Sequence, residues 1–153
     1  MKYAYSTVLL FMMLAPIKGI SQGSVKEMVD SKRFTFQAQS MTPLKGGLRT
    51  LTPGYTLKVS PDTITSDLPY AGRAFQAAYG SSDGGMKFKA TDFDYTVKEK
   101  KSGWTINIIT KKVSGSPRVM ISVYDNGNAR IVISSTDRDS ITYNGVVGDG
   151  GSQ

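Results

Sequence analysis

Two residue types that carry much of enzyme chemistry are missing from this 153-residue sequence, which has no cysteine and no histidine. Without histidine there is no side chain that titrates near neutral pH, and a Ser-His-Asp triad cannot be assembled. Without cysteine there is no thiol nucleophile and no disulfide, and the commonest zinc ligands are absent. No P-loop or nucleotide-binding glycine fingerprint is present either. We therefore expect no cofactor and no metal, and we favour a non-catalytic role.

The N-terminus predicts an export signal. Lys2 is followed by the short apolar run 4–17 and by small residues at 19–21, the arrangement that a signal peptidase recognises. Pro16 and Lys18 interrupt the run, which is short for a bilayer core of ~30 Å. We expect cleavage after Ser21, and release to the periplasm or the outside of the cell with no transmembrane span.

Residues 22–153 are expected to form one β domain, with 148–153 as a flexible tail. Loss of Lys2 and Lys18 would lower the 19 basic residues to 17, against 12 acidic ones. These charges are scattered, and the densest cluster, 98–101, lies beside an expected turn. A nucleic-acid surface usually combines a basic stripe with stacking aromatics, so we expect no nucleic-acid partner. The lysines are better explained as solvated strand ends that discourage edge pairing.

Alternating apolar and polar residues run through the domain and predict strands. The clearest signal is a hairpin of 118–124 and 129–135 around the turn DNGN at 125–128. A final strand is expected at 141–147. Further strand-like runs occupy 48–68 and 86–113, separated by Gly, Pro and Asp turn signals.

The start of the domain differs from the rest. Residues 22–34 predict a short helix with Val25, Met28 and Val29 on one face. A strand at 33–40 follows, with Phe34 and Phe36 on the same side, and 41–47 is expected to be a loop. No helical segment separates later strands, so they must pair antiparallel. The predicted fold class is mainly β, an antiparallel barrel or sandwich of about eight strands with one short N-terminal helix.

A family resemblance covers nearly all of this domain. The segments MTP, YTLKVSPDTI, LPYAGRA, YGSSDGG, FDYTVKEKKSGW and ITYNG occur in that order. The chain resembles domain-of-unknown-function family 4251, whose members are small exported bacterial proteins. The resemblance implies an exported, mostly β single domain. It implies no activity, and no catalytic residue can be transferred.

Carboxylates are the remaining candidates for catalysis or metal binding. Asp92 and Asp94 would share one strand face, with Asp83 nearby, as a calcium site or a hydrolytic pair would require. We favour a solvent-facing row instead, because inward Phe93 and Tyr95 would alternate with it.

The segment 67–85 is the candidate ligand-binding region, with Tyr70, Arg73, Phe75 and Tyr79 as its site residues. Aromatics and a fixed cation on loops at a barrel mouth suit an anionic or sugar-like ligand. The alternative is a plug across the barrel end, in which Tyr70 and Phe75 are core and Arg73 pairs with Asp67 or Asp83.

These features favour a small non-catalytic binding module of the cell envelope that uses the barrel mouth. Its partner would be a small ligand or an envelope protein. An interaction protein that holds a partner through a sheet edge or face is the alternative, and a carboxylate hydrolase is a weaker third. A barrel interior filled by side chains such as Phe34, Phe36, Tyr55 and Leu57 would move function to the loops or the outer face.

Overall fold

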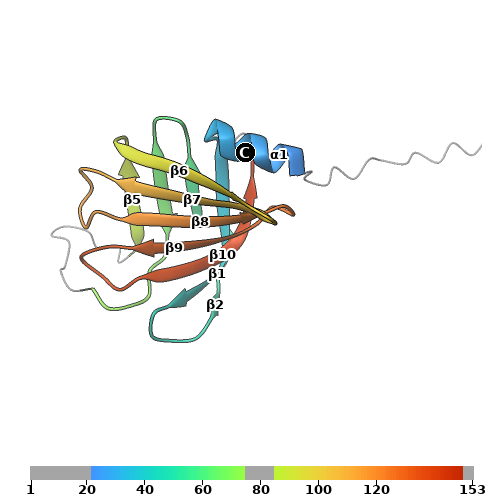
Figure 1. Cartoon of the computed structure of the whole chain (residues 1–153). Coiled ribbons are helices and arrows are strands. Elements are labelled where there is room, and N and C mark those ends of the chain that lie inside the picture. Colours follow the sequence, from blue (N-terminus) through green and yellow to red (C-terminus); the bar gives the residue numbers. More distant parts are fainter. Residues whose placement is uncertain (1–21, 75–84, 150–153) are drawn as a thin grey trace, which may run out of the picture.

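The computed structural model describes residues 22–74 and 85–149 (Figure 1). Its elements are α1 (Gln22–Ser31), β1 (Phe34–Pro43), β2 (Arg49–Thr50), β3 (Thr56–Val59), β4 (Ile64–Leu68), β5 (Met86–Ala90), β6 (Phe93–Lys100), β7 (Gly103–Thr110), β8 (Arg118–Tyr124), β9 (Asn128–Ser134) and β10 (Ile141–Gly148). The predicted class is confirmed, since the described chain is mainly antiparallel β with one short helix. β10 runs one residue into the stretch expected to be a tail, of which 150–153 lie outside the described residues.

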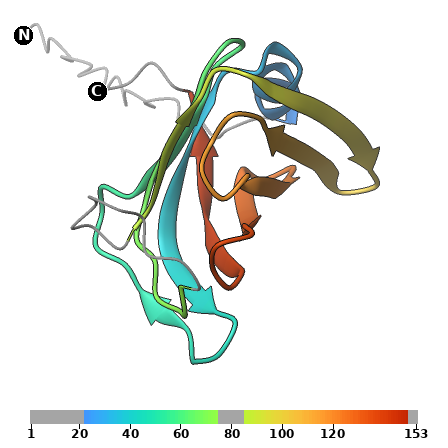
Figure 2. The same cartoon turned by 90° about the vertical axis from the view of Figure 1, so that its left-hand side faces the viewer.

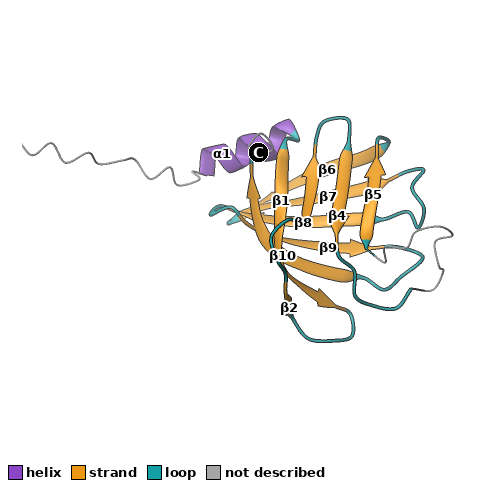
Figure 3. Ribbon diagram, turned by 180° about the vertical axis from the view of Figure 1, so that it is seen from behind, coloured by secondary structure: helices purple, strands orange, loops and turns teal. Residues whose placement is uncertain are grey.

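One antiparallel sheet contains all the strands. Its order is β5-β4-β3-β1-β10-β9-β8-β7-β6, and β2 pairs separately with β1. β1 and β3–β5 run across the direction of β6–β9 (Figures 1 and 3), so the sheet folds over onto its own inner face. The two end strands, β5 and β6, are consecutive in the chain and are joined through Thr91 and Asp92 alone. The result is a nearly closed barrel.

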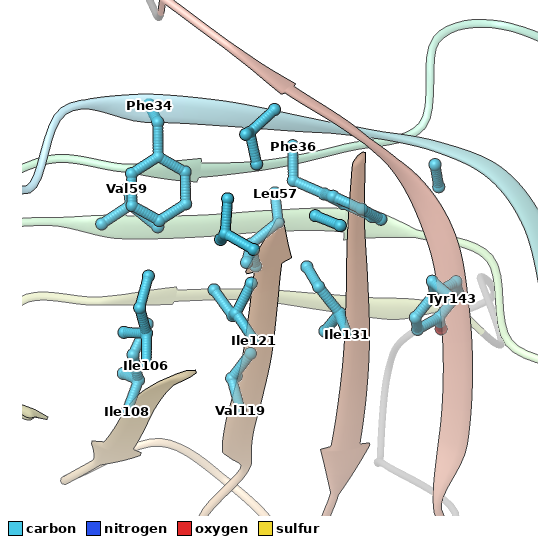
Figure 4. Close-up of a cluster of buried hydrophobic side chains, with 14 of the residues drawn as sticks. Phe34, Phe36, Leu57, Val59, Ile106, Ile108, Val119, Ile121, Ile131 and Tyr143 are labelled. Atoms are coloured by element: carbon cyan, nitrogen blue, oxygen red, sulfur yellow. The ribbon is translucent and has the colours of Figure 1, made fainter. Parts of the chain in front are cut away.

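The interior of the barrel is filled by apolar side chains (Figure 4). Strands β8 and β9 alternate strictly, so that Val119, Ile121 and Val123 are buried while their neighbours face water. Phe34, Phe36 and Leu57 are at most 1% exposed and meet these side chains from the crossing strands. Tyr55 packs against the same cluster from a partly exposed position. The described residues therefore leave no central cavity for a ligand.

Helix α1 packs on the barrel through the face that its spacing predicts. Val25, Met28 and Val29 are all buried. The Tyr95 hydroxyl donates a 2.9 Å hydrogen bond to the carbonyl of Val29, and Lys32 Nζ lies 5.1 Å from the centre of the Tyr95 ring. Burial raises the pKa of Tyr95, so this phenol stays protonated and keeps donating.

The prediction of a loop at 41–47 is partly wrong, because β1 continues to Pro43. A bulge lies between Ala38 and Ser40 in the pairing of β1 with β10. A bulge inserts one extra residue and reverses the alternation beyond it, so Met41 and Pro43 face inward rather than Ser40. The simple period of two fails at this point, and the alternation in the sequence therefore ends before the strand does.

The hairpin of β6 and β7 forms one end of the sheet (Figure 2), where β7 pairs with β8 and β6 is the end strand. Residues 96–100 of β6 are all exposed, whereas the facing residues of β7 are mostly buried. The basic cluster at 98–101 therefore lies on a solvated strand end and turn, as its sequence predicts.

Candidate functional site

The mouth segment, residues 69–74, is fixed to the loop between β9 and β10. The Tyr70 hydroxyl lies 2.9 Å from the carbonyl oxygen of Arg73 and 3.1 Å from that of Asp139. The amide of Asp139 donates to the same Arg73 carbonyl at 3.0 Å, and Ala74 forms an antiparallel bridge with Arg138. These contacts hold the backbone at Arg73 in one place.

A second tyrosine anchors the start of the mouth segment. Tyr143, on β10, is fully buried and donates a 2.7 Å hydrogen bond to the carbonyl of Pro69. Burial raises its pKa. Tyr70 and Ala71 also pack against the core cluster. The segment therefore covers part of the barrel end, as the plug hypothesis requires of it.

An ion pair that sequence reasoning missed lies beneath this segment. Arg138 donates from Nε and Nη2 to the two carboxylate oxygens of Asp137, at 3.2 and 3.0 Å, and from Nη1 to the carbonyl of Gly85 at 3.0 Å. Its guanidinium carbon lies 5.2 Å from the centre of the Tyr70 ring, and Ser135 Oγ also donates to Asp137. The Arg138 hydrogen bonds lower the pKa of Asp137. These contacts join three separate chain segments at the mouth.

The candidate site residues have different surroundings. The hydroxyl of Tyr70 is used within the fold, and burial raises its pKa. The Arg73 side chain is exposed and has no ion pair within the described residues. Asp67, its expected partner in a plug, lies 3.5 Å from Lys87 instead. Phe75, Tyr79 and Asp83 lie outside the described residues.

The carboxylates form surface ion pairs rather than a cleft. Asp94 pairs with Lys111 at 2.8 Å and Asp92 pairs with Lys112 at 3.1 Å, all at substantially exposed side chains. The hydrogen bond from Lys111 to Asp94 raises the pKa of the lysine. Phe93 and Tyr95 pack inward, and Asp94 faces solvent between them as predicted. Asp92 lies before the strand, in the turn after β5, and is half-buried. Within 22–74 and 85–149, no three acidic, histidine or cysteine side chains are grouped closely enough to hold a metal ion.

A hollow of ligand size lies on the outside of the barrel. This outer groove, of about 730 Å³, lies against the outward face of β1 and β3 and beneath the loop from β2 to β3. It is lined by Thr35, Gln37, Ala38, Gln39, Thr50, Leu51, Pro53, Gly54, Thr56, Lys58 and Asp149. No sequence signal pointed to it, because it depends on where β2 and β3 pair along β1.

Fold and mouth together define a small antiparallel β-barrel protein with a filled interior and loop segments pinned across one end. The chain belongs to the family described as Domain of unknown function (DUF4251), which matches residues 20–147. The resemblance seen in the sequence is thereby confirmed.

A solved structure has the same fold. It is the crystal structure of a DUF4251 family protein from Bacteroides eggerthii DSM 20697, with a TM-score of 0.66 and 15% sequence identity. The match covers 86% of this chain and 89% of that one. No curated protein matches this chain. None of the helices in the described ranges is long and apolar enough to cross a membrane.

Proposed function

We propose that this protein is an exported, non-catalytic binding module of the cell envelope, and that Arg73 at the barrel mouth anchors an anionic ligand. One observation carries the site: the Arg73 backbone is held by two hydrogen bonds to its carbonyl, while its guanidinium is exposed and unpaired within the described residues. A guanidinium on a fixed backbone can bind phosphate or carboxylate through two parallel hydrogen bonds. Export is supported by the apolar run and small residues at 1–21.

The other predicted residues have supporting parts in this proposal. Tyr70 orients Arg73 through its hydroxyl rather than touching the ligand with it. Phe75 and Tyr79 remain predicted members of the site. The surface ion pairs of Asp92 and Asp94 support a non-catalytic role, because a glycosidase needs two carboxyl groups facing one cleft.

Ligand-induced shifts in melting temperature test the site. Glucose 6-phosphate and inorganic phosphate are the anionic probes, and glucose is the neutral one. We expect the anionic probes to raise the melting temperature of the wild type. Arg73→Ala should weaken binding at least tenfold, because a hydrogen bond to a charged group contributes about 1.5–3 kcal/mol.

The matched control is Arg130→Ala, which removes an exposed arginine from the outer face of β9. It should keep the wild-type response. Equal shifts in the wild type, Arg73→Ala and Arg130→Ala would show that Arg73 anchors nothing.

A second candidate function is an interaction protein that holds an envelope protein through a sheet face. Ile109 and Met120 are 42% and 44% exposed on the outer face of β7 and β8, and Met120 stands directly opposite the half-buried Val132 of β9. A photo-crosslinking residue at Met120 should then capture one defined partner in cells, and the same residue at Thr96 should not. Equal labelling at both positions would contradict this function.

A further inference from the structure

We propose that the outer groove is a second binding site, for a neutral polyhydroxylated ligand such as a short oligosaccharide. Its volume of about 730 Å³ is within the roughly 300–1,000 Å³ in which ligand pockets usually fall. It shares no lining residue with the mouth segment, so this site does not depend on the proposed role of Arg73.

The groove exists because two strands pair with β1 on one side and leave a gap between them. β3 pairs with residues 34–37 of β1, and β2 pairs with Ser40 and Met41. The bulge falls between these two pairings. The intervening chain, 51–55, leaves the sheet and forms the wall of the groove.

The backbone at the groove is already hydrogen-bonded. The amide of Ala38 donates to the carbonyl of Tyr55, and the amide of Leu51 donates to the carbonyl of Gln39, both at 2.9 Å. On its other side β1 is paired with β10. An extended peptide that adds a strand needs free backbone groups, so recognition in this groove must come from side chains.

The side chains that line the groove have free hydrogen-bonding capacity. Gln37 and Gln39 are exposed on the outward face of β1. Thr35 and Thr56 flank them on β1 and β3. None of these four side chains has a hydrogen-bond partner in the described parts of the chain. An amide or a hydroxyl both donates and accepts, which matches sugar hydroxyls that do the same.

The charges of the groove disfavour an ionic ligand. Lys58 is its one lining cation and Asp149 its one lining anion within the described residues. A polyanion would meet Asp149, and a polycation would meet Lys58. Leu51 and Pro53 add apolar surface from the overhanging loop, against which the C–H groups of a sugar ring can pack. A neutral ligand with many hydroxyls fits this combination best.

The test is titration of the isotopically labelled full chain with cellotetraose, chitotetraose, xylotetraose and maltotetraose. The side-chain amides of Gln37 and Gln39 give their own NMR signals, so contact is observed directly. We expect at least one tetrasaccharide to shift both signals, with a Kd near the millimolar range. Gln37→Ala combined with Gln39→Ala should weaken that binding at least tenfold.

Two control variants distinguish binding in the groove from binding elsewhere on the barrel. Asn107→Ala combined with Ser134→Ala removes polar side chains from the outward faces of β7 and β9, and it should bind as the wild type does. Arg73→Ala should also leave the binding unchanged, so failure at the mouth and failure at the groove can be told apart. No shift of either glutamine signal with any of the four sugars at about 20 mM, well above a millimolar Kd, would overturn the proposal, as would an unaltered Kd in the double glutamine variant.

Discussion

At the scale of single residues, Asp137 and Arg138 make the densest set of polar contacts at the mouth. Their side chains are only 14% and 15% exposed. Arg138 reaches Gly85, at the start of β5, and the ring of Tyr70. Removing either charge would leave the other poorly solvated and without its main partner. The resulting loss of stability is larger than the net stability that the pair contributes. The mouth therefore depends on an ion pair between neighbouring residues that also joins distant ones.

This pair predicts a pH dependence of stability. The folded pKa of Asp137 is lowered, first by the hydrogen bonds from Arg138. Its contribution is therefore complete above the ordinary carboxyl pKa of 3.8 and is lost as the pH falls through the lower folded value. In acid urea titrations we expect the free energy of unfolding to fall in the wild type.

Asp137→Asn and Arg138→Gln should both reduce this fall, because the first removes the titrating group and the second removes the cause of its low pKa. Both variants should also be less stable than the wild type at neutral pH. An unchanged acid slope in both would contradict the assignment of the slope to this pair.

The sequence predicted some single-residue contacts and not others. Asp94 faces solvent between inward Phe93 and Tyr95, because strand alternation alone decides its orientation. The Arg138 contacts could not be predicted, since Gly85 and Tyr70 reach it only through the three-dimensional path of the chain. Arg138 and Asp137 lie in a polar segment whose composition is the same as that of an ordinary exposed loop.

At the scale of elements, the pairing of β1 with β10 leaves no room for a side chain at one position. Ala38 stands opposite Gly145 next to the bulge. A Cβ added at Gly145 would overlap the carbonyl oxygen of Gln37 and would lie 3.1 Å from the Cα of Ala38. Both neighbours are backbone atoms, so no side-chain rotation can relieve the overlap.

We therefore expect Gly145→Ala to destabilise the protein by about 1–3 kcal/mol, the usual cost of overpacking. Urea denaturation monitored by Trp104 fluorescence measures it. The matched control is Gly148→Ala at the end of the same strand, where an added Cβ has nothing within 4 Å. A neutral Gly145→Ala would mean that β1 and β10 separate easily at the bulge.

Sequence patterns predicted the existence of the strands better than their extents. The Asn-Gly turn and its alternating flanks placed β8 and β9 to within one residue. The end of β1 was missed, because the bulge reverses the alternation and the proline at 43 is typical of a loop. β1 tolerates Pro43 because, beyond Met41, only β10 pairs with it, so this end of β1 is an edge of the sheet.

At the scale of the whole molecule, the filled interior determines where ligands can bind. Composition and alternation predicted a barrel or sandwich, but not how far the sheet closes, since closure depends on twist and crossing summed over all strands. The glycine-rich and aromatic segment 67–85 predicted a ligand-binding site at the mouth. The outer groove had no signal, because its polar residues are ordinary outward positions of two strands.

The filled interior predicts a sharp contrast between neighbouring residues of β8. Ile121 is fully buried and Met120 is 44% exposed on the opposite face. Ile121→Ala should lower the free energy of unfolding by about 2–5 kcal/mol, because it loses the transfer free energy of the removed atoms and leaves a cavity. Met120→Ala should stay within about 0.5 kcal/mol. Similar losses in urea denaturation for the two variants would contradict a packed interior.

The central pairing of the sheet joins β1 to β10, the first and last strands of the described residues, with Phe36 opposite Val147. While a ribosome is still making the protein, β1 has β3 beside it but lacks its other neighbour until residues 141–148 have emerged. Contacts so distant along the chain form slowly. Completion of the barrel is thus deferred until β10 has been made, which leaves a time window in which the earlier strands lack their central partner.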